Sequence, residues 1–114
     1  MENCIFCRII RGEIPSAKVY EDEKVYAFRD INPQAPVHVL IVPKMHMANI
    51  LEAAEIGGDI MTAMTHAAAE IAKMEGVAET GFRLITNCGR DGAQSVEHLH
   101  LHLLGGKQLT EQMA

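Results

Sequence analysis

The alternation of apolar and polar residues is most regular near the end of the chain, where residues 96–104 read VEHLHLHLL. Successive side chains of a β-strand point to opposite faces, so this segment predicts a strand with histidines on one face and leucines on the other. Other runs rich in β-branched and apolar residues also predict strands. The predicted strands are residues 18–20, 24–29, 36–43, 82–87 and 96–104. The run at 36–43, PVHVLIVP, is almost continuously apolar, which indicates a central strand buried on both faces.

Two segments have helical spacing. Residues 4–12, CIFCRIIRG, predict a short helix that stops at Gly12. A longer helical region follows His46, with apolar residues at steps of three and four: Ile60, Met61, Met64, Ala67, Ile71 and Met74. The glycine pair at 57–58 weakens the first turn of that helix. The order of elements predicts an α+β fold, an antiparallel sheet with helices packed on it.

Length and charge narrow the class of protein. We expect the 114 residues to form a single domain, residues 1–114. A net charge of −5 argues against a nucleic-acid-binding surface, and no apolar run is long enough to span a membrane. The N-terminus lacks the pattern of a secretory signal, so we expect a cytoplasmic protein. Its three cysteines are then expected to be reduced or metal-bound.

Three histidines on one strand face, His98, His100 and His102, have three interpretations. They could form a polar strand face without a function, although unpaired buried imidazoles are costly. They could contribute to a zinc site, because neutral imidazole is a zinc ligand. They could also act at phosphorus, where one ring attacks and a neighbour transfers protons near neutral pH. The loop before them, GRDGAQS at residues 89–95, offers main-chain N–H groups that could hold an oxyanion, which favours phosphorus.

A second group of candidate ligands begins with Cys4 and Cys7, in the sequence CIFC. A redox CxxC motif normally follows a strand, and only three residues precede Cys4. Half of a structural zinc site fits better, and His46 and one histidine of the 98–102 cluster are the available partners. Redox-active or simply buried thiols are the alternatives.

The chain also resembles a known family along nearly its whole length. HLHLHLL resembles the alternating histidine motif of the histidine triad superfamily, and DINPQAPVH with LLGG is similar to its nucleotide-binding, HINT-type branch. This resemblance implies the histidine triad fold, with a five-stranded antiparallel sheet, a short N-terminal helix and one long helix. It further implies a homodimer with a continuous ten-stranded sheet.

The resemblance implies hydrolysis of nucleoside 5′-phosphoramidates or adenylated amines through a nucleotidyl-histidine intermediate, with an AMP or GMP moiety as the bound purine nucleotide. His100 would be the nucleophile, His102 would assist the leaving group, and His38 would complete the imidazole network. The phosphate would be held by Ser95, Asn87 and the main chain near Ala93, and the ribose by Asp30. The apolar slot for the base would consist of Phe6, Ile9, Ile14, Phe28 and Ile31.

Relatives with the CxxC motif imply a structural zinc bound by Cys4, Cys7, His46 and His98.

Two features depart from the family pattern. Ala93 replaces a glycine, which raises the question of whether its φ can be positive. The C-terminal KQLTEQMA lacks the aromatic tail of some relatives. Two other functions remain open: hydrolysis of dinucleoside polyphosphates, and regulatory nucleotide binding with vestigial catalysis.

Overall fold

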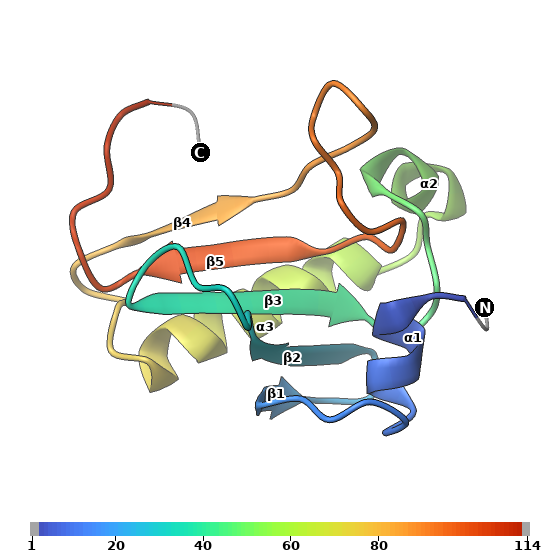
Figure 1. Ribbon diagram of the computed structural model, residues 1–114, viewed down its shortest axis with the longest axis horizontal. Coiled ribbons are helices and arrows are strands. Elements are labelled where there is room, and N and C mark those ends of the chain that lie inside the picture. The colour runs from blue at the N-terminus through green and yellow to red at the C-terminus, as the bar shows by residue number, and fades with distance from the viewer. Residues whose placement is uncertain (1–2, 113–114) are drawn as a thin grey trace.

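The computed structural model describes residues 3–112 and contains one five-stranded antiparallel sheet with the strand order β1-β2-β3-β5-β4. The strands are β1 (Lys18–Glu21), β2 (Val25–Arg29), β3 (Val37–Pro43), β4 (Phe82–Ile85) and β5 (Leu101–Gly105). The apolar strand β3 lies at the centre, between β2 and β5, as its sequence predicts (Figure 1). The α+β fold with a five-stranded antiparallel sheet is therefore confirmed.

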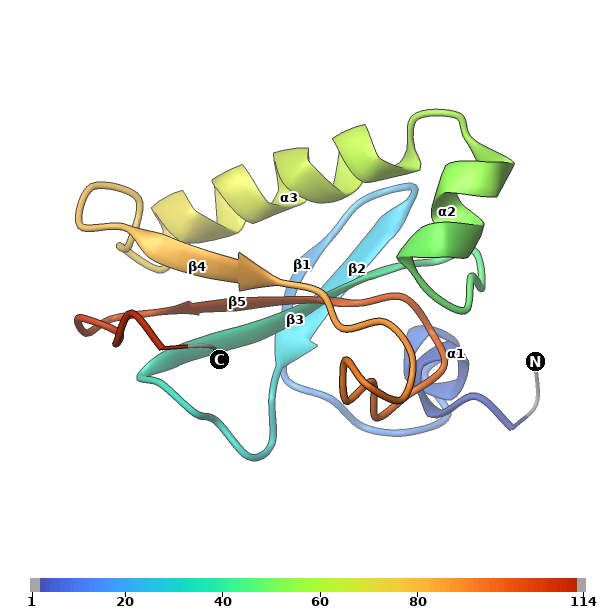
Figure 2. The ribbon, with the colours of Figure 1, turned by 90° about the horizontal axis from the view of Figure 1, so that it is seen from above.

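The helices divide between the two faces of the sheet. Helix α3 (Ile60–Met74) covers one face, together with α2 (Ile50–Ile56), and α1 (Ile5–Ile10) lies on the opposite side (Figure 2). The larger apolar cluster contains α3 residues and the inward-facing residues of the strands, and a smaller cluster surrounds Phe6 and Phe28 on the α1 side. None of the helices in residues 3–112 is both long and apolar enough to cross a lipid bilayer.

Helix α2 is a separate helix, so the prediction of one short and one long helix was incomplete. The side chain of Asn49 caps α2 by accepting a hydrogen bond from the N–H of Glu52 (3.0 Å). Gly57 and Gly58, with φ of 71° and 76°, then separate α2 from α3. The two glycines take a backbone conformation that is costly for other residues, which explains why the helical region divides at this point.

The last strand begins later than its alternating pattern predicts. Strand β5 starts at Leu101 and not at residue 96, and its pairing with β3 ends at Ile41. Pro43 has no N–H to donate to the ladder, and the N–H of Leu99 donates to the carbonyl of Met47 instead (2.7 Å). The alternation of faces nevertheless persists, because Leu99, Leu101 and Leu103 all enter the larger cluster beneath α3.

Candidate active site and metal centre

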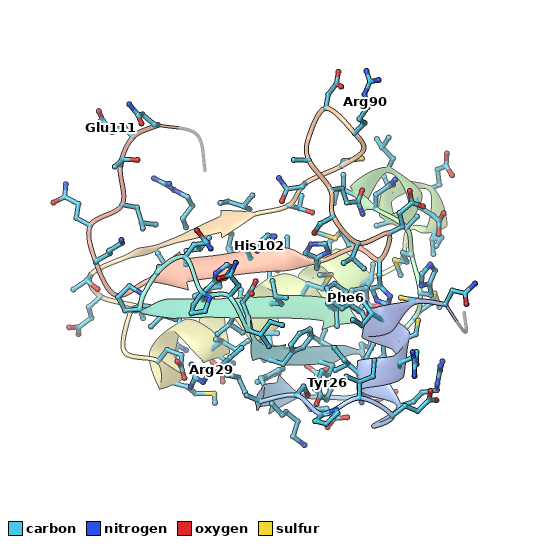
Figure 3. The ribbon with its side chains drawn as sticks, viewed as in Figure 1. Phe6, Tyr26, Arg29, Arg90, His102 and Glu111 are labelled. Atoms are coloured by element: carbon cyan, nitrogen blue, oxygen red, sulfur yellow. The ribbon has the colours of Figure 1, made fainter. Side chains whose placement is uncertain are left out.

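The imidazoles form a row across the face of the sheet that carries α1. The centroids of the His100 and His102 rings are 5.1 Å apart, and that of His38, from β3, is 5.2 Å from that of His102. The Phe6 ring contacts both His98 and His100 edge-on, with centroid distances of 5.9 and 5.1 Å. Figure 3 shows His102 on the face turned to the viewer, with Phe6 on the α1 side of it. The predicted sharing of one face is confirmed.

The hydrogen bond of His100 identifies the nitrogen that can attack a substrate. Nδ1 of His100 lies 2.7 Å from the carbonyl oxygen of His98. A carbonyl oxygen only accepts, so Nδ1 carries the proton and the lone pair of the neutral ring lies on Nε2. The carbonyl of His100 in turn accepts a hydrogen bond from the hydroxyl of Thr86 (3.0 Å). The ring is therefore fixed with Nε2 available as a nucleophile.

His38 and His102 form a hydrogen-bonded pair with a defined direction. The N–H of Gln34 donates to Nδ1 of His38 (3.0 Å), so the proton of neutral His38 lies on Nε2. That Nε2 donates to Nδ1 of His102 (3.0 Å), which leaves the proton of His102 on its own Nε2. Burial lowers the pKa of His38, and burial with the neighbouring His100 and His38 lowers that of His102 to about 4. Near neutral pH both rings are uncharged, and His102 can donate a proton.

Asp30 also approaches this pair, with Oδ2 3.5 Å from Nε2 of His38. The three residues have the donor types of a metal site. A metal on Nε2 of His38 would move that ring's proton to Nδ1, where it would face the N–H of Gln34. This group is therefore better described as a proton relay with a carboxylate beside it.

A second cluster lies where α1, the turn after β3 and the segment before β5 meet. It consists of Cys4, Cys7, His46 and His98, whose ligand atoms all lie within 4.8 Å of one another. The Nδ1 of His98 is 3.2 Å from Sγ of Cys4 and 3.6 Å from Sγ of Cys7, and the Nδ1 of His46 is 3.4 Å from Sγ of Cys7. The four side chains that were predicted as ligands are thus brought together.

The dimensions of this cluster fit zinc. Tetrahedral zinc with ordinary Zn–S and Zn–N bond lengths places sulfur and nitrogen ligands about 3.6 Å apart. Nε2 of His98 donates to the carbonyl of Pro43 (2.9 Å), which directs the lone pair of Nδ1 to the two sulfur atoms. Burial lowers the pKa of His98, so the ring is neutral, as a metal ligand must be.

The loop between β4 and β5 is held by side-chain amides. Nδ2 of Asn87 donates to the carbonyl of Gly92 (2.7 Å). Gln94 accepts a hydrogen bond from the N–H of Gly89 (3.0 Å) and donates to the carbonyls of Ala48 (2.7 Å) and Val96 (2.9 Å). The contacts of Gln94 tie three separate segments together. The sequence showed an amide in this loop but not its partners.

Two other features of the loop bear on the predicted phosphate site. Ala93 has a φ of 59°, so it adopts the left-handed conformation that glycine would adopt more easily. Its N–H is used within the loop, where it donates to the carbonyl of Arg90 (3.0 Å). In the part of the chain that the structure describes, Ser95 has no hydrogen-bond partner for its N–H or its hydroxyl.

The residues predicted for the base slot are only partly assembled. Phe6, Ile9 and Phe28 belong to the smaller apolar cluster, and Ile14 packs against them. Ile31 lies apart from them, on the loop after β2, with a side chain that is 99% exposed. A nucleobase could therefore contact this cluster, and Ile31 would contact it only from the outer side.

A cavity of about 420 Å³ lies beside the relay and is lined by His38, His102 and Asn87, among others. It continues to Arg83 of β4 and to Lys107 of the C-terminal tail. Figure 3 shows His102 between the loop that joins β4 to β5, with Arg90 at its tip, and the tail that carries Glu111. Arg83 and Lys107 belong to no motif that the sequence shows.

Comparison with known proteins agrees with this geometry. The family model described as HIT domain matches residues 11–109. The chain belongs to the HIT family. A HIT family hydrolase from Clostridium thermocellum has the same fold, with a TM-score of 0.95, 52% identity, and coverage of 100% of this chain and 99% of that one.

Two relatives of this HIT protein have names that describe an activity or a ligand. The chain is 48% identical to the purine nucleoside phosphoramidase of Escherichia coli, over 99% of this chain and 95% of the relative. It is 51% identical to the 14 kDa zinc-binding protein of Zea mays, over 92% of this chain and 83% of the relative.

Proposed function

We propose that this HIT protein is a nucleoside phosphoramidate hydrolase that releases a nucleoside 5′-monophosphate from an amine. The observation that carries the proposal is the pair of complementary imidazoles, His100 with a free lone pair on Nε2 and His102 with a proton on Nε2. One ring can form a bond to phosphorus while the other protonates the departing nitrogen. The 48% identity to the Escherichia coli phosphoramidase supports this reaction and a purine nucleotide as substrate.

The reaction takes two steps. In the first, Nε2 of His100 bonds to phosphorus, the P–N bond breaks, and the leaving nitrogen takes the proton from Nε2 of His102. In the second, a water oxygen bonds to phosphorus, the bond to His100 breaks, and Nε2 of His102 takes a proton from that water. Nδ1 of His102 accepts from His38 throughout, which keeps the ring in one orientation. Both histidines return to their initial state.

The nucleotide would lie across the face that carries α1. The phosphate would contact the hydroxyl and N–H of Ser95, which have no partner among the described residues, at the end of the loop that Asn87 and Ala93 help to shape. Asp30 would accept hydrogen bonds from the ribose hydroxyls. The base would lie against the cluster of Phe6, Ile9, Ile14 and Phe28, with Ile31 on its outer side.

Incubation with adenosine 5′-phosphoramidate tests the proposal. The wild-type protein should release AMP, and His100→Ala should lose nearly all of that activity because the nucleophile is absent. Wild-type turnover in His100→Ala would exclude the assigned nucleophile. Turnover of diadenosine polyphosphates but not of phosphoramidates would favour the second hydrolase class, and saturable binding of AMP without turnover would indicate a regulatory module.

We also propose that Cys4, Cys7, His46 and His98 hold a structural zinc. Four protein ligands leave no open position, so the ion would stabilise the junction of α1 with the segment before β5 and would not activate water. The zinc-binding name of the Zea mays relative supports this assignment. Thiol ligands persist in a reducing compartment, which is consistent with the predicted cytoplasmic location.

We further propose a homodimer in which the β4 strands of two copies pair into a ten-stranded sheet. Strand β4 lies at one edge of the sheet, so one side of its backbone is open to another strand. Phe82 and Leu84 of this strand are each 39% exposed, so pairing of the two edges would cover two apolar side chains in each copy.

A further inference from the structure

The cavity beside the relay lies on the side where a leaving group would depart. It is lined by His102, whose Nε2 carries the proton for the departing nitrogen, and by Asn87 and His38. The apolar cluster proposed for the base lies elsewhere, around Phe6 and Phe28, and contributes no residue to this cavity. A group bound to the nitrogen that accepts the proton from His102 would therefore extend into the cavity.

The charge of this cavity is opposite to that of the chain. The protein has a net charge of −5, yet Arg83 and Lys107 line the cavity and none of its described lining residues is an aspartate or glutamate. Neither Arg83 nor Lys107 forms an ion pair within residues 3–112. Two cations without carboxylate partners beside a reactive centre favour an anionic ligand.

Arg83 is held in position and keeps donors for a ligand. Its Nη2 donates to the carbonyl of Thr110, a neutral acceptor in the C-terminal tail. A guanidinium has five N–H donors, so most of them remain for another acceptor, and its planar shape matches a carboxylate. The bond to Thr110 also holds the tail along one side of the cavity.

Part of the cavity wall is apolar, so it favours a ligand that also carries an apolar group. Ile85, Leu104 and Leu109 line the same cavity, so apolar side chains lie beside the two cations. A volume of about 420 Å³ is sufficient for a small organic group. An α-amino acid with an apolar side chain presents both a carboxylate and an apolar group next to its amine nitrogen.

We infer that this cavity is a leaving-group subsite that selects amines bearing a carboxylate, so that the preferred substrates are nucleoside phosphoramidates of apolar amino acids. The inference rests on the proposed function. Arg83 and Lys107 bind the carboxylate, and Ile85, Leu104 and Leu109 contact the side chain. In the first step the P–N bond breaks and the amino acid leaves with the proton from His102.

A pair of substrates that differ in one group tests the subsite. The adenosine 5′-phosphoramidates of leucine and of leucinamide share the apolar side chain, and only the first has a carboxylate. We expect kcat/KM to be at least about 5-fold higher for the leucine substrate, since hydrogen bonds to charged groups contribute more than neutral ones. In the double variant Arg83→Gln/Lys107→Gln the ratio should fall close to one. The control Lys73→Gln, on α3 across the sheet, should keep the wild-type ratio.

Equal rates for the two substrates in the wild type, or an unchanged ratio in the double variant, would overturn the inference. A higher kcat/KM for diadenosine triphosphate than for the leucine substrate would also overturn it, because the anion bound would then be a polyphosphate. If no phosphoramidate is hydrolysed, the proposed function fails and the subsite is tested by binding. Calorimetry with His100→Ala should then show tighter binding of the leucine compound than of the leucinamide compound, and equal affinities would refute the subsite.

Discussion

Nε2 of His38 lies 3.0 Å from Nδ1 of His102, and this contact determines the proton on both rings. The N–H of Gln34 occupies the other nitrogen of His38, so protons can be arranged in only one way while both rings are neutral. A positive charge on His102 would put a second proton between the two rings. The hydrogen bond between the two rings and their burial therefore both favour the uncharged form of His38 and His102.

The first prediction concerns pH. The pKa of His102 is lowered to about 4 in the folded protein, below the unfolded value near 6.5. Between these values the unfolded chain binds more protons, so stability is complete above about pH 6.5 and falls as the pH decreases toward 4. The loss attributable to His102 is at most about 3 kcal/mol. NMR titration of the histidine Cε1–H resonances, assigned with His102→Gln, should give a midpoint well below 6.5.

Urea denaturation between pH 4 and 7 gives the matching stability test. The decrease in unfolding free energy at low pH should be smaller in His102→Gln than in the wild type, because one buried imidazole is removed. A midpoint of 6.5 for His102, or equal slopes in the two proteins, would contradict a buried neutral pair.

The sequence predicts the faces of this site better than its boundaries. Alternation placed His98, His100 and His102 on one face, and this remains correct although the strand ladder begins only at Leu101. The start of β5 depends on Pro43 and on the hydrogen bond from the N–H of Leu99 to the carbonyl of Met47. An alternating pattern of apolar and polar residues does not predict either effect. A signal for α2 was present in the sequence, since an asparagine followed three residues later by a glutamate is a capping pattern.

Contacts between distant segments could not be derived from spacing. Ligand chemistry pointed only to an unspecified histidine of the 98–102 cluster, and the family resemblance selected His98, which lies 94 positions from Cys4. The bridging role of Gln94 depends on three hydrogen bonds to segments on either side of it. Ile31 was expected in the base slot through the family resemblance, and its side chain is 99% exposed in the folded chain.

The second prediction concerns the strained loop. Ala93 adopts a φ of 59°, which costs a residue with a Cβ about 1–2 kcal/mol relative to glycine. Ala93→Gly should therefore stabilise the protein by about 0.5–1 kcal/mol in urea denaturation, after the greater freedom of glycine in the unfolded chain is included. The control Ala69→Gly, on the exposed side of α3, should destabilise it by about 1 kcal/mol. Destabilisation by Ala93→Gly would contradict the left-handed conformation.

The third prediction concerns the bridge at Gln94. Gln94→Ala removes the contacts to Gly89, Ala48 and Val96, so the segment that carries Ser95 loses its fixed position. We expect kcat/KM for adenosine 5′-phosphoramidate to fall by about 10-fold or more, because displaced hydrogen-bond donors stabilise the charge of the transition state less well. Gln112→Ala, exposed in the tail and outside the cavity, is the matched control and should have a smaller effect. Wild-type kinetics in Gln94→Ala would show that the loop does not need this amide.

The fourth prediction concerns the dimer. Leu84→Lys places a charge on the exposed edge strand β4, and burying that charge between two copies would be costly. Light scattering after size-exclusion chromatography should show a dimer for the wild type and a shift toward monomer for the variant. Leu51→Lys, on the exposed side of α2, should remain dimeric. A monomeric wild-type protein at micromolar concentration would refute the proposed pairing.

The last prediction concerns the metal cluster. Purified without a chelator, the protein should contain about one zinc per chain, because two thiols and two imidazoles already lie at the spacing of zinc ligands. Cys4→Ser/Cys7→Ser should contain none, and its Tm should be lower by about 10 °C or more, as expected for a loss of a few kcal/mol in a domain of this size. Cys88→Ser, outside the cluster, should keep both the zinc and the Tm. Elemental analysis and thermal unfolding measure these quantities. A folded, zinc-free wild-type protein whose Cys4 and Cys7 thiols react freely would show that the cluster is stable without an ion, and the assignment would be wrong.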